Sequence, residues 1–203
     1  MIRRAINHEL WGTGLMSLTN EQQQMLLKIA KDSIAHGLKN GKALTVNTKD
    51  YSAELQEIRA TFVTLEISGA LRGCIGMLEA FQPLVVDIAK NAFLAAFRDP
   101  RFPPVSVAEY PKLEIHLSIL SPSEPMIFSS EDDLICQLRP HEDGLIMQEE
   151  GLRGTFLPSV WDSLPEPRQF LEHLKLKTGL PKNYWSDTLK IRRYHCEIIS
   201  DID

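Results

Sequence analysis

The sequence predicts an α+β fold, a mainly antiparallel sheet with flanking helices, whose strands fall into two related ββαβ units. Short segments of alternating apolar and polar residues, typical of strands, are interleaved with longer segments whose apolar residues recur every three to four positions, typical of helices. The order strand, turn, strand, proline-started helix, strand occurs at 61–120 and again at 144–199. An internal duplication accounts for this order. The alternative is an α+β domain whose hairpins look alike only because all hairpins do.

A helix is expected before the first unit, over residues 17–41. Thr19 and Gln22 have the spacing of a capping box, and apolar residues recur along one face of the segment. Gly37 is suited to end this helix, because glycine is common just after a last helical turn. The apolar face predicts that the helix packs against the rest of the domain.

The first unit begins with a strand at 61–67, whose alternation places its apolar residues on one face. A turn then leads into the segment LRGCIG, at 71–76. A helix follows at 82–97, where Pro83 suits the first turn, and it stops in the proline-containing segment RDPRFPP. The strand at 112–120 has the clearest alternation of all and completes the unit.

The second unit repeats these features. Residues 144–158 predict strand, turn, strand, and they carry a second Leu-Arg-Gly at 152–154. A helix follows at 166–180, with Pro167 near its start, and a strand at 190–200 ends the unit. The shared tripeptide is weak support for duplication, whereas the shared order of elements is stronger support.

Length and charge limit the classes of protein to consider. A chain of 203 residues can bury its own core, and we expect one domain over 1–203, with a larger subdomain at 18–121 and a smaller one at 140–200. The formal net charge of −5 disfavours nucleic acid as a partner. A local basic patch at Arg192 and Arg193 is the one feature that points the other way.

Cysteine usage and hydropathy indicate the compartment. Cys74, Cys136 and Cys196 are odd in number and lack any C-x-x-C spacing, which predicts free thiols in a reducing compartment. No apolar segment is long enough to span a membrane, and residues 1–14 lack the apolar core of a signal peptide. We therefore expect a cytoplasmic protein with no membrane partner.

The segment LRGCIG holds the first candidate site residues. Gly73 and Gly76 let a ligand approach the main chain closely, although a bulged strand has the same need for glycine. Arg72 and Cys74 lie two positions apart and share a face of a flat strand, which would let the arginine lower the pKa of the thiol. Cys74 is thus a candidate nucleophile, while packing as a small apolar residue is the commoner role for a free cysteine.

His116 is the best-placed base for a cysteine nucleophile, because it lies on the polar face of the strand at 112–120. The alternative is that this face is simply solvated. No metal site is expected, since no histidines or cysteines occur in pairs at metal-binding spacing. Neither glycine-rich nucleotide-binding motif is present.

The segment RDPRF is the other dense polar cluster. Asp99 and Arg101 in it form either a staple within the loop or half of an anion site. We expect this loop to meet LRGCIG around one concave surface, because buried charges need partners. Glu79 and His116 are expected at the edge of that surface.

Four segments, FVTLEISGALRGCIG, AAFRDPRFPPVSVAEYPKLEIHLSIL, DGLIMQEEGLRGTFLPSVW and FLEHLKLKTGLPKNYW, together resemble the AMMECR domain family. Its bacterial and archaeal members are called AmmeMemoRadiSam system protein A. The resemblance covers about residues 20–199, and the hallmark LRGCIG is intact. It implies an α+β fold, no settled reaction, and an association with Memo-like and radical-SAM proteins. It also implies a functional site around Cys74. The chain departs from prokaryotic relatives at His116, where they often carry an acidic residue, and at Lys175, where several carry cysteine. These changes weaken any metal site built from that carboxylate or from the second thiol.

Two functions are left open, and with them whether the protein is an enzyme. The first is a binding or accessory module in a Memo- and radical-SAM-associated process. In it, the glycines and arginines of LRGCIG and RDPRF hold a small anionic molecule, a peptide end or a protein partner. The second is a cysteine-dependent enzyme with Cys74 as nucleophile. We favour the module, because free cysteines are more often structural. The sequence indicates no particular cofactor.

Overall fold

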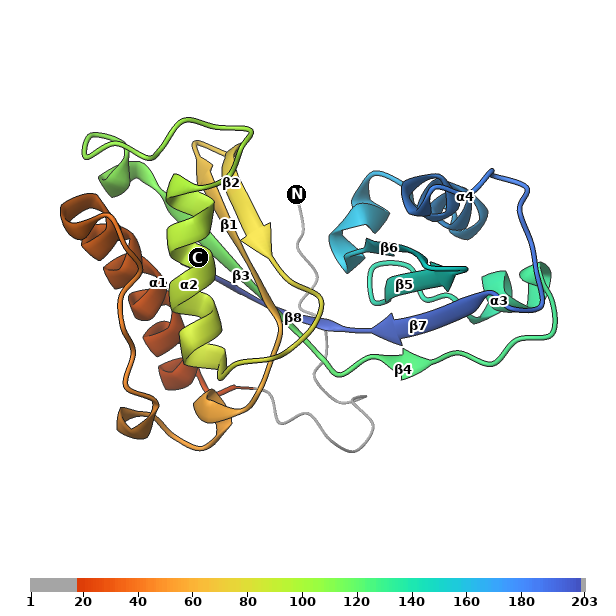
Figure 1. Cartoon of the computed structure of the whole chain (residues 1–203), viewed down its shortest axis with the longest axis horizontal. Coiled ribbons are helices and arrows are strands. Elements are labelled where there is room, and N and C mark those ends of the chain that lie inside the picture. The colour runs from red at the N-terminus through yellow and green to blue at the C-terminus, as the bar shows by residue number, and fades with distance from the viewer. Residues whose placement is uncertain (1–17, 202–203) are drawn as a thin grey trace.

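The structure is a computed structural model that describes residues 18–201. It consists of two lobes, each built on a four-stranded antiparallel sheet with helices packed against it (Figure 1). The predicted α+β fold, with antiparallel sheets and flanking helices, is confirmed. The segment 1–14, on which the signal-peptide expectation rests, lies outside the described residues.

The described α-helices are α1 (Asn20–Asn40), α2 (Leu84–Phe97), α3 (Glu131–Gln137) and α4 (Pro167–Thr178). The strands are β1 (Thr61–Ile67), β2 (Ala70–Gly76), β3 (Glu114–Leu120), β4 (Glu124–Pro125), β5 (Gly144–Glu149), β6 (Leu152–Phe156), β7 (Lys190–Tyr194) and β8 (Cys196–Ser200). None of the helices in residues 18–201 has the length and apolar character needed to cross a membrane.

The first lobe is the sheet β2-β1-β3-β8 with α1 and α2 on one face (Figure 1). Val63 and Leu65 of β1 pack with Ile88 and Ala92 of α2, and all four are completely or almost completely buried. The alternation of β1 and β3 therefore turns their apolar residues to the helices. Their intervening residues, mostly polar, lie on the opposite face, which we call the open face.

Helix α1 begins as the sequence predicts. The Thr19 N–H donates to Gln22 Oε1 (2.8 Å) and the Gln22 N–H donates to Thr19 Oγ1 (3.3 Å), which completes the capping box. The expectation that Gly37 ends the helix is wrong, because Gly41, at φ +68°, is the residue that caps it. Gly37 lies inside the helix where α2 crosses, and a Cβ there would be 2.4 Å from the Phe97 ring.

The second lobe is the sheet β4-β7-β5-β6 with α4 on one face. Its core holds Trp161, whose ring stacks on Phe170 of α4 with the ring centroids 3.7 Å apart. The Trp161 indole N–H donates to the Asp143 carbonyl (2.8 Å), so the one polar group of this buried ring is satisfied.

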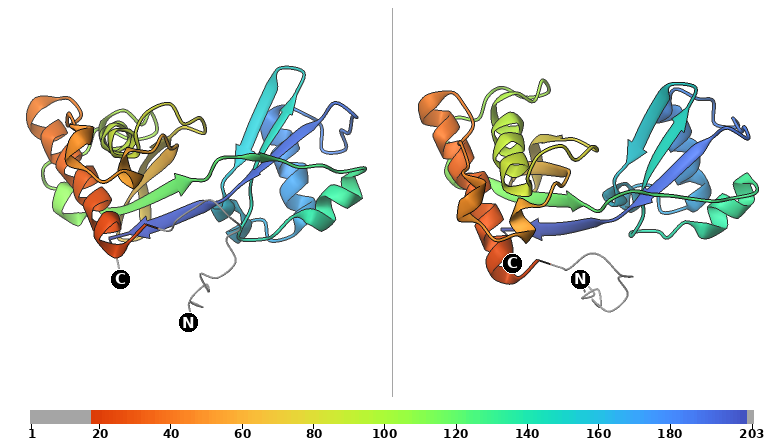
Figure 2. Two further views of the ribbon diagram at one scale, coloured as in Figure 1. Left: turned by 90° about the horizontal axis from the view of Figure 1, so that it is seen from below. Right: turned by 60° about the horizontal axis from the view of Figure 1, so that its bottom comes forward.

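The two lobes share one topology, as the repeated order of elements predicts. In the first lobe, β1 and β2 form a hairpin, β3 pairs with the other side of β1, and α2 follows the hairpin in the chain. The second lobe has β6-β5-β7 with α4 in the same place. The lobes then exchange strands, because the chain runs from β3 into β4 and from β7 into β8 (Figure 2). The strand expected at 190–200 is therefore two strands, β7 and β8, and the prediction that all of it belongs to the second unit is wrong, because β8 pairs with β3 of the first sheet.

Candidate functional site

The hairpins β1–β2 and β5–β6 have the same kind of turn, but the first hairpin has one additional, unpaired residue in its second strand. Both turns are two residues long with positive φ, at Ser68–Gly69 and at Glu150–Gly151, which matches the twist of paired strands. In the second hairpin the register is regular, and Arg153 pairs with Gln148. In the first, the register shifts between Leu65 and Glu66, and this bulge leaves Arg72 unpaired.

This bulge separates the directions of Arg72 and Cys74. Arg72 is 9% exposed, and its guanidinium binds Glu109 (2.7 Å) and the Pro103 carbonyl (2.9 Å). The hydrogen bond from Arg72 is the main cause that lowers the pKa of Glu109 to about 2. The expectation that Arg72 and Cys74 share a strand face is wrong, because a bulge interrupts the alternation of side chains.

The glycines of the repeated Leu-Arg-Gly serve helix packing. A Cβ on Gly73 would lie 2.2 Å from the Ala95 carbonyl oxygen of α2, and one on Gly154 would lie 2.2 Å from Thr178 Oγ1 of α4. A Cβ on Gly76 would lie 2.4 Å from the Phe62 ring. The expectation that Gly73 and Gly76 leave an open ledge is wrong, since protein atoms occupy the space beside both.

The predicted meeting of LRGCIG with the RDPRF loop does occur, along the main chain of β2. The Cys74 N–H donates to Asp99 Oδ2 (2.9 Å), and Arg101 Nη2 donates to the Cys74 carbonyl (3.2 Å). Arg101 also binds Asp99 (2.7 Å) and is the largest cause that holds the pKa of Asp99 well below its usual range, against the opposing effect of burial. Because β2 is an edge strand, these two side chains satisfy backbone groups that another strand would otherwise pair.

The Cys74 side chain lies on the open face, in one row with Thr64 and His116. Thr64 Oγ1 is 3.2 Å from Cys74 Sγ, and Thr64 is paired with His116 on its other side. Cys74 and His116 are thus two strand spacings apart, about 10 Å, which is beyond hydrogen-bond reach. The nearest charged group to His116 is Glu66, with Nε2 and Oε2 separated by 3.7 Å. With Glu114, these two side chains form a group of three whose ligand atoms all lie within 4.8 Å of one another, and no other group of three or more His, Cys, Asp or Glu residues within 18–201 does so.

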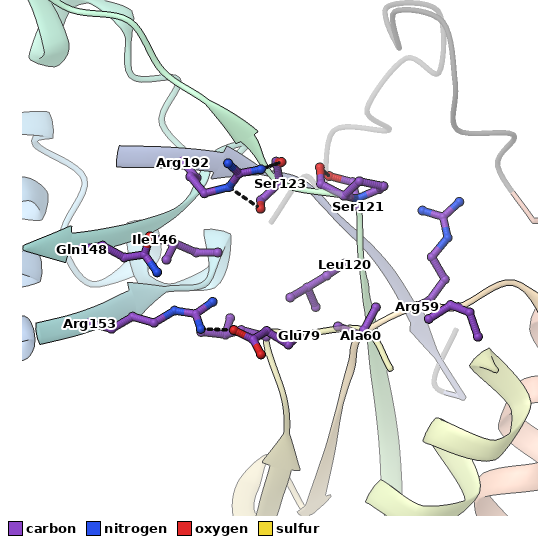
Figure 3. A pocket seen from close by; sticks show the side chains of 14 residues that line it. Arg59, Ala60, Glu79, Leu120, Ser121, Ser123, Ile146, Gln148, Arg153 and Arg192 are labelled. Carbon is purple, nitrogen blue, oxygen red and sulfur yellow. Dashed lines mark hydrogen bonds and ion pairs between the residues drawn. The ribbon is translucent and has the colours of Figure 1, made fainter. Parts of the chain in front are cut away.

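A cleft of about 580 Å³ lies between the lobes, and we call it the interlobe cleft (Figure 3). Its floor is apolar, with Ala60 and Leu120 from the first lobe facing Ile146 from the second. Its charged lining consists of Arg59, Glu79, Arg153 and Arg192. Glu79 is therefore the one predicted site residue that lines this cleft.

The charged groups of the interlobe cleft differ in how they are paired. Arg153 forms an ion pair with Glu79 across the two lobes. Arg192 donates to Ser123 Oγ (2.9 Å) and to the Ser123 carbonyl, both neutral acceptors. Three arginines against one glutamate leave the lining with a formal excess of two positive charges.

Arg59 completes this charged lining. It pairs with the half-exposed Glu57 (2.6 Å) outside the cleft, while its Nη1 is shielded from solvent and has no hydrogen-bond partner. An unpaired buried N–H is costly, so this guanidinium favours an additional acceptor. The repeated Leu-Arg-Gly is a signal for Arg153, whereas no sequence pattern singles out Arg59 or Ser123.

The three cysteines are unpaired in the structure, as the sequence predicts. Cys136 is exposed, whereas burial raises the pKa of the Cys196 thiol to about 12. Lys175 is fully buried and binds Glu131 (2.7 Å). It therefore has a structural partner within the second lobe.

Fold and cleft together define a two-lobed α+β protein with a ligand-sized cavity between repeated units. The chain belongs to the AMMECR1 family, which it matches over residues 27–199. It is 34% identical over 190 residues to a protein of Methanothermobacter thermautotrophicus, covering 91% of this chain and 96% of that one. Protein MJ0810 of Methanocaldococcus jannaschii is 32% identical over 194 residues, covering 92% and 93%.

A solved structure shares this architecture. The crystal structure of the uncharacterised protein PH0010 from Pyrococcus horikoshii has a TM-score of 0.81 and 32% sequence identity to this chain. The similarity covers 89% of this chain and 92% of that one. The overall fold of this chain is thus shared by a solved structure of an uncharacterised protein.

Proposed function

We propose that this protein is a binding module that holds a small anionic ligand in the interlobe cleft. The observation that carries the proposal is Arg192, a cation at the cleft wall whose hydrogen bonds go to the neutral oxygens of Ser123. Its charge is not neutralised by those bonds, and a desolvated cation binds an anionic oxygen more strongly than a solvated one does.

The size and lining of the cleft support this class of ligand. A volume of about 580 Å³ falls within the usual range for small-molecule sites, and an apolar floor with a few polar groups at the rim is their common composition. The lining includes Glu79, which was expected at the edge of the site, but its arginines, Arg59, Arg153 and Arg192, are not those of LRGCIG and RDPRF. The edge formed by Arg72, Cys74, Asp99 and Arg101 is then a support for the first lobe.

The wider role is part of the same proposal. We assign the module to a cytoplasmic process associated with Memo-like and radical-SAM proteins, as the family resemblance implies. The alternative, an enzyme with Cys74 as nucleophile, has less support, because neither Arg72 nor His116 contacts the thiol. The groups beside the thiol are Thr64 Oγ1 and the Arg101 guanidinium.

Calorimetric titration with inorganic pyrophosphate at low salt tests the proposal. We expect saturable binding that Arg192→Ala weakens roughly 10- to 100-fold, the loss of one charge-assisted contact. Glu79→Gln should strengthen binding a few-fold, because it removes the only carboxylate of the lining.

The matched control is Arg168→Ala on α4, which removes one positive charge from an exposed ion pair with Asp132 of α3. It should leave the pyrophosphate affinity nearly unchanged. Binding that is equally weakened by Arg168→Ala and Arg192→Ala would reflect net charge alone and would contradict a site in the cleft. Absence of any pyrophosphate binding would also contradict a site in the cleft.

A further inference from the structure

The open face of the first sheet carries a cluster of ligand-type side chains that the interlobe cleft does not use. We propose that Glu66, Glu114 and His116 form a binding site for a divalent transition-metal ion, with Zn²⁺ as its representative. Their ligand atoms all lie within 4.8 Å of one another. This proposal is independent of the anion site, since none of the three residues lines the interlobe cleft.

The strand register brings the three side chains together. Glu66 of β1 is directly opposite Glu114 of β3, and His116 lies two residues further along β3 on the same face. His116 Nε2 is 3.7 Å from Glu66 Oε2. The two central strands of the first sheet, β1 and β3, hold these positions, so the backbone of the site is more rigid than a loop.

The opposed glutamates need a cation. Like charges placed directly across two strands destabilise a sheet, and burial makes the repulsion larger because solvent screens it less. The Glu66 side chain is 31% exposed, and Glu114 is also partly buried. Within residues 18–201 no lysine or arginine forms an ion pair with either carboxylate. A divalent ion between them would convert this repulsion into attraction.

His116 provides a second observation that favours a cation at this position. Its Nε2 is shielded from solvent and has no hydrogen-bond partner, although it is directed at Glu66. Polar nitrogens that are withdrawn from water almost always have a partner. A metal ion would be bound by the lone pair of this nitrogen in the neutral imidazole.

The donor set selects the class of ion. One imidazole and two carboxylates suit zinc, manganese and ferrous iron, whereas Mg²⁺ and Ca²⁺ prefer oxygen ligands alone. Ligands of Zn²⁺ at about 2.0 to 2.2 Å lie roughly 3.4 Å from one another, so the side chains need to close by only about an ångström. Three protein ligands leave a coordination position for water or an exogenous ligand.

Zinc binding to the whole chain, first freed of metal with EDTA, tests the site. Titration with ZnCl₂ should show one ion per chain, with an affinity that Glu66→Gln and His116→Gln each lower by at least roughly tenfold. Titration with MgCl₂ should show no comparable binding. The control His141→Gln alters an exposed histidine paired with Asp162 and should leave zinc affinity unchanged.

Thermal unfolding, measured with and without zinc, distinguishes a metal site from a merely structural cluster of these three side chains. Without metal, Glu66→Gln should raise the melting temperature by about 2 °C, because it relieves the repulsion with Glu114. Zinc should raise the melting temperature of the unmodified protein and not that of Glu66→Gln. Absence of one-to-one zinc binding overturns the proposal, and so does zinc binding that survives both Glu66→Gln and His116→Gln.

Discussion

Asp99 acts on the edge strand β2 as a neighbouring strand would. Its carboxylate accepts the Cys74 N–H, and its partner Arg101 donates to the Cys74 carbonyl, so one ion pair satisfies both backbone groups of one residue. Asp99 is 4% exposed, and the low pKa of its carboxyl keeps it ionised. The hallmark cysteine is therefore placed by its backbone, while its thiol lies on the other side of the sheet from the helices.

Replacing Asp99 with Asn should destabilise the protein by about 1 to 3 kcal/mol at pH 7, because a buried charge-assisted contact is lost. Urea unfolding followed by circular dichroism measures this change. Asp132→Asn, which breaks an exposed ion pair on α3, should change the free energy of unfolding by less than about 1 kcal/mol. Equal effects of the two substitutions would contradict the role assigned to Asp99.

The same carboxyl makes stability depend on pH in a defined direction. The pKa of Asp99 is lower in the folded than in the unfolded chain, so its stabilising effect is complete above about pH 4 and is lost as pH falls below that value. Asp99→Asn should therefore flatten the loss of stability on acidification. Glu109, with a pKa of about 2, keeps part of the slope in both proteins.

At the scale of elements, one additional residue gives two similar hairpins different functions. Arg153, in the regular hairpin, faces the interlobe cleft beside Gln148. Arg72, in the bulged hairpin, turns to Glu109 and holds the loop after α2. The glycine that follows each arginine admits the helix of its own lobe, and this packing is what the two units have in common.

Gly73→Ala should destabilise the first lobe by about 1 to 3 kcal/mol or more, because the added methyl meets a helix carbonyl at 2.2 Å and no side chain can move aside. Urea denaturation measures the loss. Leu71→Ala, at an exposed position two residues earlier in β2, should cost less than about 1 kcal/mol. A Gly73→Ala protein as stable as the original would show that the close approach of α2 is not required.

Patterns within one element were predictable, and contacts between elements were not. The α1 capping box and both hairpins follow from neighbouring residues, whose interactions are local. A bulged strand was one of the two alternatives for the glycines of LRGCIG, but the position of the bulge at Arg72 was not predictable, because a one-residue shift depends on how β2 packs against α2. Gly37 was assigned to a helix end, since the crossing Phe97 that requires a glycine lies sixty positions away in the chain.

On the scale of the whole molecule, the exchange of strands fixes the lobes to each other. Two chain crossings, β3 to β4 and β7 to β8, run between the sheets (Figure 2). A small apolar cluster that includes Leu120 and Tyr194 packs where the lobes meet. The interlobe cleft opens beside this cluster. Its lining comes from strand ends and the segments beside them that are distant in sequence, which is why Arg59 and Arg192 could not be grouped before the fold was known.

The central claim is that this cleft between the repeated units is the ligand site. Backbone amide NMR spectra of the isotope-labelled protein, titrated with pyrophosphate, test it most directly. We expect saturable shifts concentrated at the cleft lining, including Ala60, Ile146 and Arg192, with small shifts at Cys74 and Arg101. Shifts concentrated instead at Cys74 and Arg101 would contradict the claim and return the site to LRGCIG and the RDPRF loop.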